Sequence, residues 1–415
     1  MSDPDDDLSL PRGAALTARD AQFREDPDAL YDSLRVHAPI YRDTAYGRTL
    51  LTRFDDVRSV LRHKKFGVDA RKSHPDSYMR RVAATGVSGR EGQTAYEPPL
   101  VLLDDPAHRR IRLLMSKAFT PHAIEAMKPR IQVITDELLA TFEDESEIDF
   151  IERFAGPLPT LIIAEMLGVP STHGADLKRW SDKILQGYDP ERDVTTQRGL
   201  RESYVEMSAL LKETVAARRR KPVEDLISAM IRAQEESDSL TDLEIISLCT
   251  QLLVAGNVTT TDLMGNGLHA LMAHPAQMHK LQASPQLIEQ AVEEILRYDC
   301  PLTETARIAL DELSISGCPF SQGDTLTVSL AAANHDPAQF PQPHEFDIER
   351  GDATHLAFGS GVHVCLGAPL ARLEGQICLQ AFIQRFPTVR PGTESPRRRR
   401  LPFFRGFECL PVKLS

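Results

Sequence analysis

The longest apolar pattern in the chain runs from Leu243 to Ala273 and ends before Pro275. It follows Thr241, Asp242, Leu243 and Glu244, in which the threonine and the glutamate have the spacing of a capping box. Proline disfavours a helical conformation in the residue before it, so the helix is expected to stop at His274. A helix of about thirty residues is exceptionally long for a globular protein. We therefore expect it to cross the molecule.

Shorter patterns fill most of the remaining chain. We expect short helices over Pro27–His37 and Asp55–His63, and a hairpin over Ile40–Phe54 that turns at Tyr46-Gly47. Residues 122–235 read as mostly helical, Thr325–Ala333 reads as a strand, and the irregular stretch Gly67–Pro99 is typical of a lid or binding loop. Residues 1–20 are expected to be flexible. Because no linker divides residues 21–415, we expect them to form a single domain.

Composition narrows the function. The 415 residues carry a net charge of −12, which argues against nucleic acid as a partner. No segment approaches the roughly eighteen consecutive apolar residues of a membrane span, and the acidic N-terminus lacks the order of a secretory signal. A cytoplasmic protein with no membrane partner is expected. The six cysteines show no CxxC spacing, which favours reduced thiols over a disulfide framework or a zinc site.

The stretch from Phe358 to Gly367 carries the strongest chemical signal. It presents Cys365 in a loop that contains Gly359, Gly361 and Gly367, and glycine lets such a loop lie close to a flat ligand. A helix is predicted directly after it, with Pro369 in the first turn. A thiol before a helix N-terminus is favoured as thiolate, which suits an axial ligand of haem iron. The alternative for a lone cysteine is a small buried hydrophobe in a turn.

Three further pairs have helical spacing. His108 and Arg112 share one helix face, as would the charges of an ordinary surface helix. Gly256 and Thr259 leave space beside a hydroxyl, or belong to a loosely packed core helix; the glycine costs about 1 kcal/mol there. Glu294 and Arg297 are spaced as an ion pair, which on a surface would contribute under about 1 kcal/mol.

The motif Phe-x-x-Gly-x-His-x-Cys-x-Gly resembles the haem-binding signature of the cytochromes P-450. The resemblance covers roughly residues 30 to 412 and keeps the family's order of motifs. It implies a mainly α fold with a smaller β-rich lobe, and haem b between a long central helix and the cysteine loop. It also implies that Cys365 is the axial ligand of the haem iron.

The resemblance assigns the other residues to four groups. His108, Arg112, Arg307 and His363 match haem propionate ligands, with Phe358, Gly359, Gly367 and Ala255 as further cofactor contacts. Gly256, Asn257 and Thr259 match the oxygen-binding segment, in which the threonine helps to deliver protons. Glu294, Arg297 and Arg350 match a structural triad. The substrate pocket is expected to include Tyr78, Tyr96, Val258, Leu302, Thr303, Glu304, Phe403 and Phe404.

One departure from the family pattern concerns proton delivery. The family has an acid directly before the threonine, whereas this chain has Val258. Asn257 with ordered water, or Asp262, could substitute. The departure also leaves open a peroxide-driven oxygenase, a haem-thiolate isomerase or dehydratase, and a non-catalytic haem-thiolate sensor.

The resemblance implies a monooxygenase that uses O2 and electrons from a ferredoxin and its NADH- or NADPH-dependent reductase. Arg109, Arg110 and Lys117 are candidates for the docking patch of an acidic ferredoxin. The apolar and aromatic pocket residues predict a small to medium hydrophobic substrate. The sequence identifies neither that substrate nor the oligomeric state.

Overall fold

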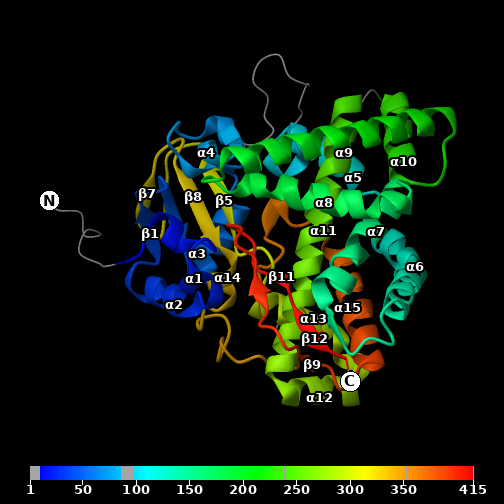
Figure 1. Ribbon diagram of the computed structural model, residues 1–415. Helices are drawn as coiled ribbons and strands as arrows, with labels where there is room; N and C mark the ends of the chain where they lie inside the picture. The colour runs from blue at the N-terminus through cyan, green and yellow to red at the C-terminus, as the bar shows by residue number, and fades with distance from the viewer. Residues whose placement is uncertain (1–9, 86–97, 238–239, 351–353, 415) are drawn as a thin grey trace. The chain divides into compact units, whose positions relative to one another are not determined.

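The computed structural model describes residues 10–85, 98–237, 240–350 and 354–414, and it is mainly helical with small β-sheets (Figure 1). The chain divides into two compact units. Unit 1 comprises Met1–Ala83, Asn266–Cys365 and Pro396–Glu408, and unit 2 comprises Ala84–Gly265, Leu366–Ser395 and Cys409–Ser415. Neither unit is a continuous stretch of chain, which explains why no linker in the sequence marks a boundary.

Unit 1 contains a five-stranded sheet in the order β1-β2-β8-β5-β3. The predicted hairpin is confirmed: β1 (Ile40–Asp43) pairs antiparallel with β2 (Arg48–Leu51), and Gly47 has a φ of +59° in the turn. β2 runs parallel to β8 (Thr325–Ser329), with Leu50 opposite Thr327. β5 (Glu304–Ala309) lies antiparallel between β8 and β3 (Phe66–Gly67).

Helices and short elements complete unit 1. The predicted helices appear as α2 (Asp28–His37) and α3 (Phe54–Arg62). The remaining described elements that begin in this unit are η2 (Gly13–Leu16), α1 (Ala21–Glu25), η3 (Ala70–Lys72), α4 (Tyr78–Thr85), α12 (Pro275–Ala283), η8 (Pro285–Leu287), α13 (Ile288–Tyr298), β6 (Leu313–Ile315), β7 (Cys318–Phe320), α14 (Leu330–Asn334), η9 (Gly361–His363), β10 (Arg397–Arg398) and β11 (Phe407–Cys409).

The segment before α1 is anchored to the rest of unit 1. Residues 1–9 lie outside the described part of the chain, but the backbone N–H of Gly13 donates to Asp43 Oδ1 at 3.0 Å. Leu16 is buried with Leu34, Tyr41 and Leu50. An apolar side chain of residues 13–16 therefore joins the core, while the flexibility expected for residues 1–20 stays a prediction.

Unit 2 is built around α11 (Asp242–Ala273), whose last eight residues belong to unit 1. The capping box is confirmed: Glu244 N–H donates to Thr241 Oγ1 at 3.1 Å, and Thr241 N–H donates to Glu244 Oε2 at 2.7 Å. The other described elements of this unit are η4 (Leu100–Leu102), α5 (Ala107–Met115), α6 (Pro121–Ala140), β4 (Glu147–Asp149), η5 (Ile151–Ala155), α7 (Pro157–Leu167), η6 (Ser171–His173), α8 (Gly174–Leu185), η7 (Gln186–Tyr188), α9 (Val194–Arg220), α10 (Leu226–Ser237), α15 (Ala368–Arg385), β9 (Arg390–Pro391) and β12 (Pro411–Lys413).

The core of unit 2 joins segments far apart in the sequence. β12 pairs antiparallel with both β4 and β9. Phe150 and Phe154 pack on Phe382 of α15, with ring centroids 4.7 and 5.4 Å apart. Thr135 of α6 lies 3.5 Å from the sulfur of Cys378 on α15. These contacts fix α15, the helix that follows the cysteine loop.

Two predicted elements differ in the structure. The stretch expected to be irregular contains α4, and residues 330–333 are helical because Ser329 caps α14 by accepting the N–H of Ala332 at 3.1 Å. α11 is the one helix among the described residues long and apolar enough to cross a membrane; 61% of its apolar window is buried, as in a core helix.

Candidate active site

The cysteine loop presents Cys365 to solvent. Of the six cysteines, all of which the structure describes, Cys365 is the exposed one. Its N–H donates to the carbonyl of Phe358 at 2.9 Å, which closes the loop. Gly359 and Gly361 have φ values of +69° and +74°, which L side chains rarely adopt. A Cβ at Gly361 would lie 2.4 Å from the carbonyl oxygen of Leu61, so this position requires glycine.

Two other glycines of the loop have open space beside them. Apart from their chain neighbours, no heavy atom of the described residues lies within 4 Å of a Cβ built on Gly359 or on Gly367. α15 begins directly afterwards, at Ala368, with a proline in its first turn as predicted. An exposed sulfur, open glycine positions and a following helix N-terminus suit a flat ligand with an axial thiolate.

Side chains from helix α13 and from the end of α14 fix the chain segment that precedes the cysteine loop. Glu293 Oε2 lies 3.1 Å from Nε2 of His355, whose Nδ1 accepts the N–H of Ala357 at 3.2 Å. The N–H of Leu356 donates to Oδ1 of the buried Asn334 at 2.7 Å. The chain before Phe358 is therefore fixed by side chains from α13 and the end of α14. The sequence did not single out these residues, because their partners are distant in the chain.

The neighbouring residue on α13 organises the predicted triad. Arg297 pairs with both oxygens of Glu294, at 2.7 and 2.9 Å, and Arg350 Nε lies 3.2 Å from Glu294 Oε1. Glu294 and Arg297 are buried. The two guanidinium groups also donate to carbonyl oxygens of the segment between α14 and Arg350: those of Asn334, Pro341, Gln342, Pro343 and Glu345. The triad thus fastens this irregular segment to α13.

Unit 1 also contains two of the predicted propionate ligands. Arg307 is buried in β5 opposite Leu326 of β8, and its Nη1 donates to the carbonyl of Ala306 at 2.8 Å. His363 is half-buried in η9, two residues before Cys365.

The other two predicted ligands lie in unit 2, on α5. His108 is buried and Arg112 is half-buried one turn later on the same face. Burial lowers the pKa of His108; Arg112 reinforces that effect, and Asp105 opposes it from 3.4 Å. Arg110 forms an ion pair with Glu244 in the first turn of α11, and the N–H of Leu100 donates to Gln251 Oε1 at 2.7 Å. α5 is therefore attached to the helix that carries Thr259.

The centre of α11 places its polar residues on different faces. Thr259 Oγ1 is half-buried and donates to the carbonyl of Ala255 at 2.6 Å. Asn257 is buried, and its Oδ1 lies 3.4 Å from Oγ1 of Thr261, which donates to the carbonyl of Ala155 at 3.1 Å. Val258 is buried as well. Positions 257 and 259 differ by about 200° around a helix, so Asn257 does not share the face of Thr259.

Gly256 allows α7 to pack closely on α11. A Cβ at this position would lie 3.2 Å from Cγ1 and Cδ1 of Ile163. The missing side chain therefore accommodates a neighbouring helix in that direction, which sequence spacing could not reveal. Ala255, by contrast, is exposed.

The aromatic residues predicted to contact substrate are mostly packed. Tyr78 is fully buried, stacks on Tyr46 with ring centroids 5.0 Å apart and lies 5.4 Å from the ring of Phe403. The guanidinium of Arg48 lies 4.8 Å from the Tyr78 ring centroid and pairs with the buried Glu304 at 2.9 Å. These contacts make Tyr78 a core side chain of unit 1. Tyr96 lies outside the described residues.

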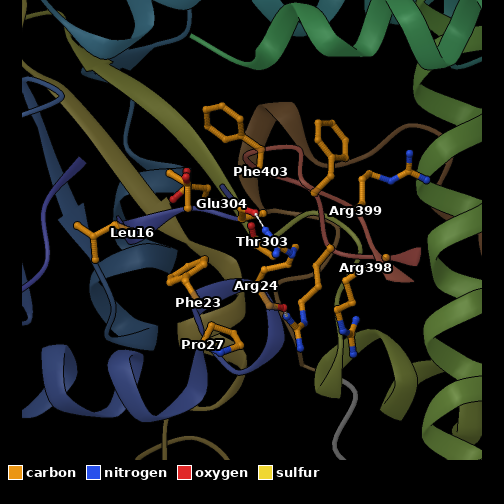
Figure 2. A pocket seen from close by; sticks show the side chains of 14 residues that line it. Leu16, Phe23, Arg24, Pro27, Thr303, Glu304, Arg398, Arg399 and Phe403 are labelled. Atoms are coloured by element: carbon orange, nitrogen blue, oxygen red, sulfur yellow. Dashed lines mark hydrogen bonds between the residues drawn. The ribbon is translucent and has the colours of Figure 1, made fainter. Parts of the chain in front are cut away.

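The hairpin end near Phe403 is held against β5. Phe403 has a φ of +71°, its carbonyl accepts the N–H of Thr303 at 2.8 Å, and Leu302 forms an isolated bridge with Phe404. Thr303, Glu304, Phe403 and Phe404 line the small cavity of unit 1 in Figure 2. Its volume of about 20 Å³ suits a water molecule and no organic substrate. This cavity is not the predicted substrate pocket.

The carboxyl of Glu374 is a further group whose charge depends on its burial. Glu374 on α15 is buried, which raises the pKa of its carboxyl to about 8. The carboxyl is therefore largely protonated at neutral pH and adds little negative charge to the interior of α15.

Comparison with known proteins gives the family. The profile of the family "Cytochrome P450" matches residues 163–407, more than half of the chain. The chain belongs to the cytochrome P450 family. It is 37% identical over 398 residues to the 6-deoxyerythronolide B hydroxylase of Saccharopolyspora erythraea, covering 95% of this chain and 97% of that protein.

Solved cytochrome P450 structures share the fold. CYP109E1 from Bacillus megaterium in complex with testosterone matches with a TM-score of 0.86 and 32% identity, over 95% of this chain and 99% of that one. P450BioI in complex with an acyl carrier protein ligated to hexadec-9-enoic acid matches with a TM-score of 0.85 and 34% identity, over 95% and 99%. The predicted mainly α cytochrome P450 fold is confirmed. The protein is a cytochrome P450 monooxygenase whose cofactor is haem b.

Proposed function

We propose that this cytochrome P450 hydroxylates a small to medium hydrophobic substrate, with O2 as oxidant and electrons from a ferredoxin and its reductase. The carrying observation is the cysteine loop, with its exposed sulfur and open glycine positions. We further propose that the enzyme works as a soluble protein in the cytoplasm.

In this proposal Cys365 holds the haem iron, and His108, Arg112, Arg307 and His363 hold the propionates. Haem held by the Cys365 thiolate would supply the cleavage of the O–O bond and the insertion of oxygen into a C–H bond. The chain itself orients the substrate and excludes water. Thr259, with its hydroxyl proton donated to the Ala255 carbonyl, retains oxygen lone pairs that accept hydrogen bonds from water on its exposed side.

The class of substrate is supported by the relatives. Those named above include a 6-deoxyerythronolide B hydroxylase, an enzyme crystallised with testosterone and one crystallised with an acyl chain on a carrier protein. Testosterone and the acyl chain are mostly apolar molecules. A hydrophobic molecule is therefore the substrate class we propose here, and a carrier-bound acyl chain lies within it.

The decisive first measurement is the absorption spectrum of the reduced, CO-bound protein. We expect a red-shifted Soret band of the thiolate type, and we expect Cys365→Ala to lose it. The matched control is Cys318→Ala, which removes another cysteine that is not fully buried. A histidine-type band unchanged in Cys365→Ala would overturn the assignment of the axial ligand.

Val258 favours a second candidate, a peroxide-driven oxygenase. A buried valine directly before Thr259 cannot relay a proton, and Asn257 lies on another face of α11. Turnover that requires hydrogen peroxide and fails with NADH, ferredoxin and reductase would select this candidate. Product formation with the reductase system would select the monooxygenase driven by O2.

A further inference from the structure

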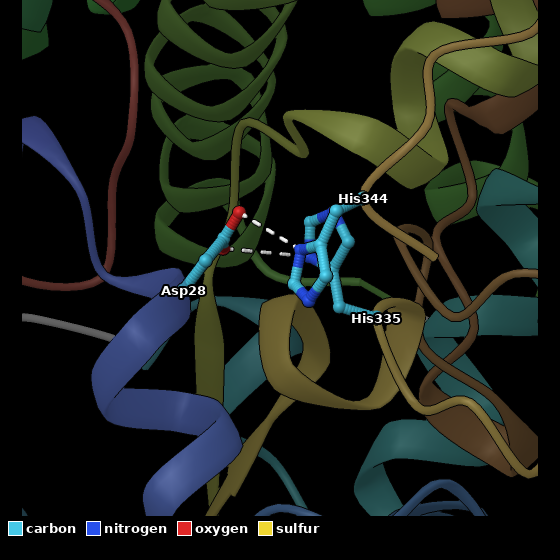
Figure 3. A group of neighbouring side chains, drawn as sticks. All are labelled: Asp28, His335 and His344. Carbon is cyan, nitrogen blue, oxygen red and sulfur yellow. Dashed lines mark ion pairs between the residues drawn. The ribbon is translucent and has the colours of Figure 1, made fainter. Parts of the chain in front are cut away.

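Two histidines and an aspartate meet at the start of α2. Asp28 is the first residue of that helix, His335 follows α14, and His344 lies in the irregular segment fastened by the triad (Figure 3). The Nδ1 atoms of His335 and His344 lie 3.6 and 3.4 Å from the two carboxylate oxygens of Asp28. The two imidazole rings stack, with an interplanar angle of 15° and centroids 5.3 Å apart.

The buried histidine lacks the partners that a buried imidazole requires. His335 is 4% exposed, and neither of its ring nitrogens has a hydrogen-bond partner among the described residues. A buried polar group without a partner is costly, so such a group calls for an explanation. Burial lowers the pKa of His335 to about 3, so at neutral pH the imidazole is uncharged and its contact with Asp28 is no ion pair. The neutral imidazole is the form that binds metals.

The exposed histidine is oriented by a second carboxylate. Nε2 of His344 lies 2.8 Å from Oδ2 of Asp32, one helical turn after Asp28, while Oδ1 of Asp32 accepts from Arg35. Nε2 of His344 is thus engaged with Asp32, and Nδ1 is the ring nitrogen directed at Asp28. Metal-binding histidines commonly donate their other ring nitrogen to a carboxylate in this way.

We propose that Asp28, His335 and His344 bind a divalent transition-metal ion, with Zn²⁺ as the matching cation. Two imidazole nitrogens and one carboxylate are a donor set that Zn²⁺ takes, with a fourth position left for water. Ligand atoms about 2.0–2.2 Å from a tetrahedral ion lie about 3.3–3.6 Å from one another. Nδ1 of His335 lies 3.6 Å from Oδ1 of Asp28 and Nδ1 of His344 lies 3.4 Å from Oδ2, so each histidine is at this spacing from one oxygen of the carboxylate. All three donor atoms lie within 4.8 Å of one another, and the stacked rings must rotate for their in-plane lone pairs to converge on one ion.

The surroundings permit the ion to enter. A cavity of about 310 Å³ in unit 1 is lined by Asp28 and His335. Other charged side chains face the three residues of the site, and their charges nearly balance. They are Asp26, Asp32, Asp299, Arg35, Arg297 and Arg405. The site is assembled from α2, the end of α14 and the irregular segment, so the bound ion joins three pieces of unit 1. It uses no cysteine, which is why the spacing of the thiols does not reveal it.

The test is zinc binding by the haem-loaded, full-length protein after dialysis against a chelator. Calorimetric titration with Zn²⁺ is expected to give one site per chain, and zinc is expected to raise Tm. His344→Gln, at a side chain 43% exposed, is expected to weaken binding at least 10-fold, and Asp32→Asn by about 10- to 100-fold. His279→Gln, an exposed histidine on α12, is the matched control and is expected to leave Kd unchanged.

Zinc K-edge absorption separates this site from the thiols. We expect nitrogen and oxygen neighbours with imidazole scattering, and no sulfur at about 2.3 Å. Sulfur ligation, or a Kd that His344→Gln and Asp28→Asn leave unchanged, would overturn the proposal. An unchanged Soret band in each variant establishes that the fold and the haem are intact. The outcome is therefore independent of whether the proposed catalytic function is right.

Discussion

At the level of single residues, the hydrogen bond from Thr259 to Ala255 determines what the threonine hydroxyl can donate and accept. The hydroxyl proton is committed to a carbonyl of its own helix at 2.6 Å, and the adjacent Val258 carries no proton. In the proposed function, a proton that passes this position would come from water that the oxygen of Thr259 accepts, because no side chain directly before it can supply one.

We therefore expect Thr259→Ala to reduce coupling while leaving the fold intact. The amount of product formed per NADH consumed should fall several-fold, and the release of hydrogen peroxide should rise, because the water that donates the proton loses the oxygen that positions it. The control is Thr261→Ala, which removes a buried hydroxyl bonded to Ala155, two positions away on the same helix. That variant should lower Tm and keep the coupling. Equal coupling in Thr259→Ala and the unaltered enzyme would remove Thr259 from proton delivery.

Residue types and spacing were sufficient to find the chemical positions but not their neighbours. The cysteine motif is local in sequence, so Cys365 and its glycines could be read directly. The role of Gly256 depends on Ile163, and that of Tyr78 on Arg48 and Phe403, which are distant in the chain. Without those partners, a glycine can mark space for a ligand or close packing of two helices, and a tyrosine can contact substrate or belong to the core.

At the scale of the element, the irregular segment before the cysteine loop depends on α13. Few regular backbone hydrogen bonds hold residues 335–350, and the side chains of Glu294, Arg297 and Arg350 supply fixed points instead. Because these side chains are buried, the arrangement is sensitive to the loss of a charge. Loss of one charge leaves another in the interior without its partner.

Glu294→Gln is expected to lower the free energy of unfolding by about 3–5 kcal/mol, because it breaks a buried ion pair. Asp176→Asn on α8 is the matched control: Asp176 and Arg179 are also three residues apart, but their side chains are 48% and 47% exposed. That change should cost less than about 1 kcal/mol. Urea unfolding followed by circular dichroism measures both. Similar losses in the two variants would contradict the argument from burial.

Elements were predictable where the signal was repeated along the helix or strand. The thirty-two residues of α11, with a capping box at the start and a proline after the end, were found almost to the residue. Short elements were missed where a single local feature decides whether a segment is a helix, a strand or a loop. The Ser329 cap turns the end of an apparent strand into α14, and α4 forms within a stretch whose polar residues and glycines hid it.

At the scale of the whole molecule, the net charge of −12 bears on the electron donor. An acidic ferredoxin is repelled by the molecule as a whole, so productive docking requires a local group of cations. Of the three candidates, Arg110 is engaged with Glu244, whereas Arg109 and Lys117 are exposed. The field of such residues reaches only about 8–10 Å at physiological salt.

A pair of charge reversals distinguishes local docking from the overall field. Arg109→Glu and Lys221→Glu each change the net charge by −2, from −12 to −14, and both residues are exposed in unit 2. If α5 carries the docking patch, Arg109→Glu should slow reduction by a plant-type ferredoxin several-fold at low salt, and the difference should shrink as salt rises. Lys221→Glu should leave the rate nearly unchanged. Equal slowing by both variants would show that only the overall charge matters, and no slowing by either would place the donor on another surface.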